Sequence, residues 1–287
     1  MSRSDTIIAA FLMWELRNTA PMLNLRYFLD PRFGVAAGVI TLVFFGMFGF
    51  FFLLTQYFQL VLGYGTLEAG VKQLPFAAVM MLVAPNSPKF AARWGTNVAV
   101  ATGLIGMSAG MFLFTIARSN TPYIQIVLVV MVMAAGMATC IPSMTGSIMS
   151  AVPLGKAGVG SAMNDTTREL GGALGVAVLG SLVASRYDAR LTPALDLLPA
   201  SLQGQAGESL AGALHAGSQL GGPEGTQVAS IAREAFISGM HLAAIIAGCV
   251  TLLAAAIVYR KLPAGNPHAI GAASVGRPSS LDLAVEH

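Results

Sequence analysis

The stretch "SAMNDTTRELGGALG", residues Ser161–Gly175, runs directly into the apolar sequence "VAVLGSLVAS" at residues 176–185. Gly171–Ala184 supplies only fourteen residues without a charge, whereas a helix needs about 20 to cross the hydrocarbon core. A span at this place therefore reaches back to about Asp165 and takes three charges into the membrane. Because each unpaired charge at mid-membrane depth costs roughly 2.5–3.5 kcal/mol on insertion scales, we expect protein partners for Asp165, Arg168 and Glu169.

A helical wheel divides this segment into two faces. The charges, Asn164 and several glycines lie within about 100° of Arg168 at 100° per residue, and aliphatic side chains lie opposite. We expect the first face to pack against protein and the second to point outward. The first face comprises Gly158, Ser161, Asn164, Asp165, Arg168, Glu169, Gly171, Gly172 and Gly175, and the second Val159, Met163, Leu170, Leu174 and Ala177.

Asn164, Asp165, Arg168 and Glu169 are the candidate functional cluster, and two interpretations remain open. A carboxyl group in a dry site has a raised pKa and a nearby arginine lowers it, so a rearranging pair can take up and release a proton as a gate moves. Alternatively, a static network of the same charges fixes this helix to a neighbour near the cytoplasmic surface. Asp165 and Arg168 have the i,i+3 spacing that either interpretation requires.

The composition of the whole chain is that of a membrane protein. Of its 287 residues, 55% are hydrophobic and only 10% charged, against roughly 25% charged in soluble domains, and the mean hydropathy is +0.70. The net charge of +3 comes without any Lys/Arg-rich run, which argues against nucleic-acid binding. The sequence therefore predicts an all-α membrane bundle.

Six stretches are long enough to cross a bilayer, and the turn-like sequences "GYGT", "RSNTP" and "AVPLGK" predict short connections between consecutive antiparallel spans. Residues 187–235 are expected to form a long loop, in which "SLAGALHAGSQL" has an amphipathic helical pattern and "GQAGE" and "GGPEG" indicate mobile connections. The predicted spans are Gly34–Leu62, Leu67–Ala84, Val98–Ile116, Tyr123–Met149, Gly158–Ala184 and Phe236–Tyr259.

The distribution of Lys and Arg predicts the topology through the positive-inside rule. With the predicted spans, ten basic residues fall on one side and four on the other, three of these in or beside the long loop. Both termini should then be cytoplasmic and the 187–235 loop external, and the charges of the Ser161–Gly175 stretch lie in the cytoplasmic part of their span.

The expected units are residues 1–33, a linker following the end of an earlier helix; 34–260, the six-span bundle; and 261–287, a disordered cytoplasmic tail.

Small and polar residues within the spans suggest how the helices pack. Gly103, Gly106 and Gly110 share a helix face and, like Gly171, Gly172 and Gly175, permit close backbone approach. Gln56, Tyr57 and Gln59 in "LTQYFQLVLGYG" either line a substrate pathway or simply bond across helices. Lys72 is expected to extend its side chain outward towards water. Pro75, Pro85, Pro88 and Pro142 mark bends or stops.

Enzymatic, metal and cofactor chemistry are not indicated. "GMSAG", Gly106–Gly110, matches GxSxG, but Ser108 lies within an apolar helical pattern rather than at a strand-to-helix turn, so packing is the favoured explanation. Cys140 and Cys249 lack metal-ligand or disulfide spacing. We therefore predict no enzyme, no metal and no cofactor.

Three motifs, taken in order, resemble a known family. "TQYFQLVLGYGTLEAGVKQLP", "KFAARWGTN" and "AVPLGKAGVGSAMNDTTRELGGALGVAVLGS" are similar to the C-terminal half of the major facilitator superfamily, specifically its fourteen-span drug/proton antiporters of the EmrB/QacA type. The similarity extends from "WELRNTAPMLNLRYFLDPRF" to "YRKLP", and its last motif is the most specific.

That resemblance implies a multi-pass exporter of the bacterial inner membrane, driven by the proton gradient, that moves hydrophobic and often cationic compounds by alternating access. It implies that Lys89, Arg93 and Gly95 belong to a cytoplasmic loop between two helices of the bundle and that Arg168 and Glu169 stand at the inner gate. The family's N-terminal bundle has no counterpart in these six spans, so a matching N-terminal half is the expected partner. The alternative from another class is a non-transporting membrane scaffold or partner subunit.

Overall fold

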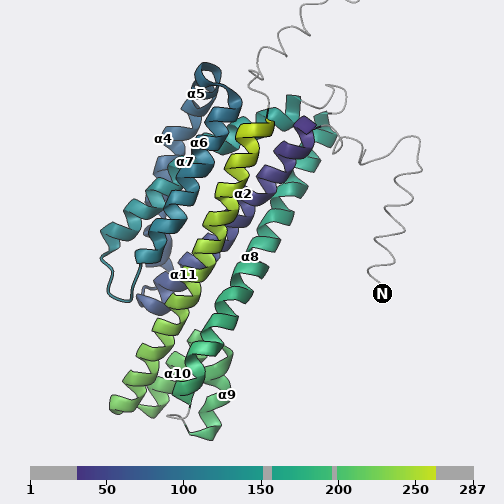
Figure 1. Cartoon of the computed structure of the whole chain (residues 1–287). Coiled ribbons are helices and arrows are strands. Elements are labelled where there is room, and N and C mark those ends of the chain that lie inside the picture. Colours follow the sequence, from purple (N-terminus) through teal and green to yellow (C-terminus); the bar gives the residue numbers. More distant parts are fainter. Residues whose placement is uncertain (1–30, 151–156, 196–198, 263–287) are drawn as a thin grey trace, which may run out of the picture.

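In the computed structural model, residues 31–150, 157–195 and 199–262 are described, and this part of the chain is helical, without strands (Figure 1). Six helical segments are long and apolar enough to cross a membrane, which confirms the predicted fold class. Most of residues 1–33 and 261–287, for which a linker and a disordered tail were predicted, lie outside the described ranges. The six segments are Gly34–Val61, Thr66–Trp94, Thr96–Ile116, Tyr123–Met149, Gly158–Thr192 and Gly222–Lys261.

The first span is helix α2, Pro31–Gln56, which continues as a π-helical turn at Tyr57–Val61. The second span is not one helix but a series: α3, Thr66–Val71; α4, Leu74–Val83; a 3₁₀ turn, Ala84–Asn86; and α5, Ser87–Trp94. Proline explains the breaks, because its ring fits the start of a helix and not its interior. Pro75 and Pro88 lie in the first turns of α4 and α5, and Pro85 lies in the 3₁₀ turn.

The third and fourth spans are α6, Thr96–Leu113, with a 3₁₀ turn at Phe114–Ile116, and α7, Tyr123–Ser150. Pro142, where a bend or stop was expected, lies inside α7 and does not end it. The fifth and sixth spans belong to α8, Ala157–Leu195, and α11, Gly222–Lys261. At 1.5 Å per residue, these two helices are each about 60 Å long, roughly twice the hydrocarbon thickness.

The predicted long loop is instead mostly helical in its described residues, although Gly221 of "GGPEG", with φ +67°, separates two of these helices. α8 continues to Leu195, α9 covers Ala200–Glu208, α10 covers Leu210–Leu220, and α11 already begins at Gly222. "GQAGE" lies in α9 and "GGPEG" starts α11, whereas the amphipathic helix predicted for "SLAGALHAGSQL" is α10. Together, α9, α10 and the adjoining ends of α8 and α11 project beyond the other helices (Figure 1). We call this projection the helical cap.

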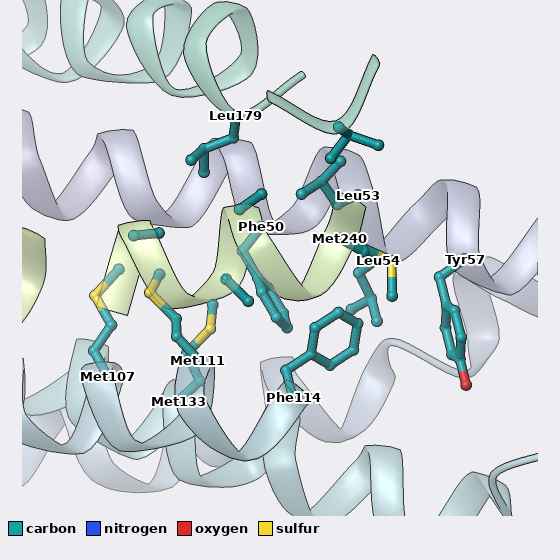
Figure 2. Packing of buried hydrophobic residues seen from close by; sticks show 14 of the residues in the cluster. Phe50, Leu53, Leu54, Tyr57, Met107, Met111, Phe114, Met133, Leu179 and Met240 are labelled. Atoms are coloured by element: carbon teal, nitrogen blue, oxygen red, sulfur yellow. The ribbon is translucent and has the colours of Figure 1, made fainter. Parts of the chain in front are cut away.

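The bundle is held by a core in which α2 packs against α8, α6 against α7, and α11 against both α6 and α8. Rings from α2 meet methionines and a phenylalanine from the α6–α7 pair (Figure 2). The Phe50 and Phe114 ring centroids are 4.8 Å apart in an edge-on arrangement, a geometry that aromatic pairs favour. The largest fully buried side chains include Tyr57, Phe58, Phe114, Met107, Met111, Met133 and Met137.

Glycines set the closest helix contacts. A Cβ atom on Gly103 would lie 2.6 Å from the carbonyl oxygen of Gly136, and one on Gly110 would lie 2.7 Å from the Cβ of Met133, so α6 and α7 meet backbone to backbone. On α8, Gly171 and Gly175 lie against the carbonyl oxygens of Thr41 and Phe45 in α2. Gly106 and Gly172 lie at the same two interfaces. This close approach is what small residues provide between membrane helices.

Candidate functional site

Arg168 of α8 connects three helices. Its Nη2 donates a hydrogen bond to Thr145 Oγ1 of α7 at 3.0 Å, and its guanidinium carbon lies 5.1 Å from the centre of the Phe44 ring of α2. Its Nη1 lies 4.0 Å from Asp165 Oδ1, and 29% of its side chain is exposed. A guanidinium can serve all three neighbours at once because its donors form a planar fork that also stacks on aromatic faces.

The two acidic side chains of the cluster do not face the neighbouring helices of this chain. The Asp165 side chain is 66% exposed, and Glu169 is exposed, with no ion pair or hydrogen bond to any described residue. The expectation that all three charges point inward is therefore correct only for Arg168. The glycine-rich contact with α2 turns α8 so that Asn164, Gly171 and Gly175 are buried. Met163, expected on the outward face, is buried as well.

Two polar atoms of this cluster have no partner within the described part of the chain: Asn164 Oδ1, an acceptor, and Arg168 Nε, a donor. Asn164 is only 5% exposed, and its Nδ2 lies 3.5 Å from Asp165 Oδ1. Asn164 and Arg168 are one helical turn apart on α8 and so share a face. A buried polar group without a partner costs about 1–3 kcal/mol, so this cluster retains hydrogen-bonding capacity beside its exposed carboxylates.

The three residues at the end of the first span have different surroundings. Tyr57 is completely buried, and its hydroxyl donates to the carbonyl oxygen of Arg118 at 2.7 Å, so the structure places Tyr57 in the core and not on a cavity wall. Gln59 is half-buried on the π-helical turn. Gln56 is also half-buried and lines a pocket of about 270 Å³ between α2, α8, α11 and the helical cap.

The predicted cytoplasmic loop residues lie on α5 and the turn that follows it. Lys89 and Arg93 are exposed on this short helix, and Arg93 lies 5.8 Å from the centre of the Trp94 ring. Gly95 separates α5 from α6 with φ +92°, a conformation that side chains other than glycine rarely adopt. α5 lies at the same end of the bundle as the C-terminal end of α11 with Arg260 and Lys261 (Figure 1).

Ser108, the central residue of the GxSxG match, is buried and donates to the carbonyl oxygen of Gly248 at 2.8 Å, which joins α6 to α11. Its role is packing between helices.

Lys72 does not extend freely towards water: its Nζ lies 4.4 Å and 4.2 Å from the ring centres of Tyr64 and Tyr123 and 3.5 Å from Glu68. The described residues contain no cluster of metal-ligating side chains.

Sequence reasoning did not identify Thr145 and Phe44 as partners of Arg168, nor Asp188 and Glu208 as pocket residues. Thr145 could have been suspected as a polar residue in an apolar span, but no periodicity distinguishes Phe44 from the other phenylalanines of α2. Asp188 and Glu208 belong to the segment that was expected to be a loop, so no helix face was assigned to them.

The chain matches the Major Facilitator Superfamily over residues 7–176, more than half of its length. It is 32% identical to the "Multidrug efflux pump LfrA" of Mycolicibacterium smegmatis over 252 residues, which are 87% of this chain and 49% of the relative. It is 30% identical to the "Tetracenomycin C resistance and export protein" of Streptomyces glaucescens over 263 residues, 87% of this chain and 47% of that protein.

A third relative is the "Methyl viologen resistance protein SmvA" of Salmonella typhimurium, 29% identical over 266 residues, 89% of this chain and 52% of that protein. The chain thus spans about half the length of the curated relatives it matches. The family match covers α2 and the first part of α8, which contains the Arg168 cluster. This chain, whose described residues form six candidate membrane spans, belongs to the Major Facilitator Superfamily.

Proposed function

We propose that this chain forms the C-terminal half of a proton-coupled exporter of hydrophobic, often cationic compounds, of the fourteen-span EmrB/QacA type, that works by alternating access. The observation that carries the proposal is the Arg168 cluster: a guanidinium anchored between α2 and α7, beside two carboxylates on the uncovered side of α8. Relatives of about twice this length are named for multidrug efflux and for methyl viologen resistance.

The coupling step uses the exposed carboxylates. Burial of a carboxyl group favours its neutral, protonated form, whereas a neighbouring guanidinium favours the charged form. When a second bundle closes over this side of α8, Glu169 loses water and takes up a proton; when the bundle withdraws, the proton leaves. Asp165 stays near Arg168, and Asn164 orients it. Arg168 provides a fixed positive charge that favours the ionised form of both carboxyl groups.

The proposed partner is a matching N-terminal half bundle. Large apolar side chains remain uncovered on α4 and α8, including Leu74, Met81, Leu82, Leu170 and Leu174, and no residue of α4 is buried. In the proposed membrane orientation, α5 and the C-terminal end of α11 are cytoplasmic and the helical cap is external, as the positive-inside rule favours. The proposed location is the bacterial inner membrane.

Efflux from drug-sensitive cells tests the proposal. The chain is expressed alone and fused to the N-terminal half of the multidrug efflux pump LfrA, and loss of an aromatic cationic dye is followed after energisation. We expect rapid dye loss with the fusion, abolition by a protonophore, and at least a tenfold slower rate for Glu169→Gln. The matched control is Glu224→Gln in the helical cap, which should leave the rate unchanged. Equal rates for the two variants would contradict a coupling role, and absence of dye loss from cells that carry the fusion would favour a scaffold.

A further inference from the structure

The pocket beside the helical cap is built by segments distant in sequence. Phe52 and Gln56 come from α2, Ser181 and Asp188 from α8, Glu208 from the end of α9, and Phe236 from α11. The cap is fixed in place: the Tyr187 hydroxyl donates to the carbonyl oxygen of Ala206 at 3.1 Å. A Cβ atom on Gly217 of α10 would lie 2.7 Å from the carbonyl oxygen of Gly225 in α11, so these helices are in backbone contact.

The walls of this pocket are apolar and aromatic. Tyr187, Leu210 and Phe236 are 3–4% exposed and form the part nearest the core. Phe52, which also lines the pocket, is 42% exposed. The hydroxyl of Tyr187 is already used by Ala206, so this residue presents mainly its ring to the cavity. A volume of about 270 Å³ exceeds the roughly 150 Å³ that suffices for benzene in an apolar cavity.

The remaining polar groups of the pocket are mainly acceptors. Asp188 and Glu208 carry negative charge, and neither forms an ion pair within the described chain. The hydroxyl of Ser181 donates to the carbonyl oxygen of Val178, and the Ser209 side chain already accepts from the amide of Gly212. The amide of Gln56 and the hydroxyl of Ser209 offer donors. An anion would therefore meet two like charges here.

The neighbouring basic residues do not neutralise these carboxylates. Arg186 and Arg190 flank Asp188 in sequence, but each is about 160° from it around α8 at 100° per residue. No basic residue is among those that line the pocket. Negative charge beside low-dielectric apolar walls attracts cations, because such walls concentrate the field. Aromatic faces add a further attraction for a cation.

We propose that this pocket is an external binding site for a small hydrophobic organic cation, formed by this half of the transporter and its helical cap. The aromatic walls hold the apolar body, and Asp188 and Glu208 hold the positive charge at the mouth. The inference deepens the proposed function and rests on it for the role of the bound cation, which is a substrate leaving on the external side. Binding itself is measured without transport.

Equilibrium dialysis of the purified full chain in an uncharged detergent tests the site, with radiolabelled benzyltrimethylammonium as the probe and benzenesulfonate as the anionic counterpart. We expect saturable binding of the cation and none of the anion. The double variant Asp188→Asn/Glu208→Gln should weaken cation binding at least tenfold. Ser181→Phe, which fills the cavity without changing its charge, should do the same.

The matched control is Glu224→Gln, an exposed carboxylate of the same cap outside the pocket, which should change binding less than twofold. Circular dichroism and size-exclusion chromatography verify that each variant keeps the wild-type fold. Absence of saturable cation binding, binding that survives both pocket variants, or equal binding of benzenesulfonate would overturn the inference. Loss of dye efflux in the fusion while binding to the purified chain persists would count against the proposed function alone.

Discussion

Arg168 on α8 and Thr145 on α7 are joined by a hydrogen bond of 3.0 Å from the guanidinium to the hydroxyl. This bond links α7 to the helix that carries Asp165 and Glu169, while the Phe44 ring of α2 lies 5.1 Å from the same guanidinium. Any movement of α8 relative to α2 and α7 must therefore break or re-form contacts of one side chain. Arg168 is therefore the residue whose contacts change when the proposed gate moves.

Arg168→Lys should slow dye efflux by the fused transporter about tenfold. A lysine keeps the positive charge but cannot reach Thr145 and Asp165 with separate donors while stacking on Phe44. Thr145→Val removes only the interhelical hydrogen bond, worth about 0.6 kcal/mol on average and at most about 1.7 kcal/mol in membrane proteins. It should therefore have a smaller effect, and Thr145→Ser almost none. The measurement is the rate of dye efflux by the fused transporter carrying each of these variants.

The control for this series is Arg190→Lys on the exposed part of α8, which should behave as wild type. If Arg168→Lys matched that control, the fork of donors would have no role. If Thr145→Val were as damaging as Arg168→Lys, the hydrogen bond to α7 alone, and not the shared contact of three helices, would explain the effect.

The class of fold and the positions of the spans follow from the sequence because hydrocarbon imposes a length and a polarity on each helix. The orientation of single side chains does not. Arg168, Asp165 and Glu169 share one half of a helical wheel, yet only Arg168 is turned inward, because the contact of Gly171 with Thr41 decides the rotation of α8. That contact depends on a helix more than a hundred residues away.

The helical cap was missed for a related reason. Glycines commonly interrupt helices, and Gly221 of "GGPEG" does separate α10 from α11. "GQAGE", however, continues α9, and Gly217 and Gly225 allow α10 and α11 to meet at backbone distance. Tertiary contact thus outweighs local propensity. The pocket with Asp188 and Glu208 depends on this cap and could not be anticipated while the segment was treated as a loop.

Gly171→Ala should destabilise the α2–α8 contact. A methyl group at this position would overlap the carbonyl oxygen of Thr41, and overpacking in a close-packed interior costs about 1–3 kcal/mol. The matched control is Gly158→Ala on the same helix, where nothing lies within 4 Å of the added methyl; there, alanine should be neutral or slightly stabilising. Thermal unfolding in detergent measures both. Equal unfolding temperatures for the two variants would show that the close contact between Gly171 and Thr41 does not contribute to the stability of the chain.

Tyr57→Phe should also lower the thermal stability of the chain. The hydroxyl of Tyr57 donates to the carbonyl oxygen of Arg118 at 2.7 Å and thereby ties the end of α2 to the turn between α6 and α7. Loss of this bond should cost about 0.5–1.5 kcal/mol, whereas the ring contact with Phe114 remains. Tyr259→Phe, at a position that is 64% exposed, is the control and should unfold as wild type does. A purely structural role also requires that dye efflux by the folded Tyr57→Phe fusion stay normal.

The proposed membrane orientation is testable with single cysteines in a Cys140→Ala/Cys249→Ala background. Glu224 in the helical cap and Arg93 on α5 are both exposed and are each replaced by cysteine. The cap and α5 lie at opposite ends of the bundle (Figure 1). Because positive charge is retained on the cytoplasmic side, a membrane-impermeant maleimide should label Glu224→Cys in intact cells. It should label Arg93→Cys only after permeabilisation. The reverse pattern would invert the topology and would place the pocket with Asp188 and Glu208 in the cytoplasm, where it would receive substrate rather than release it.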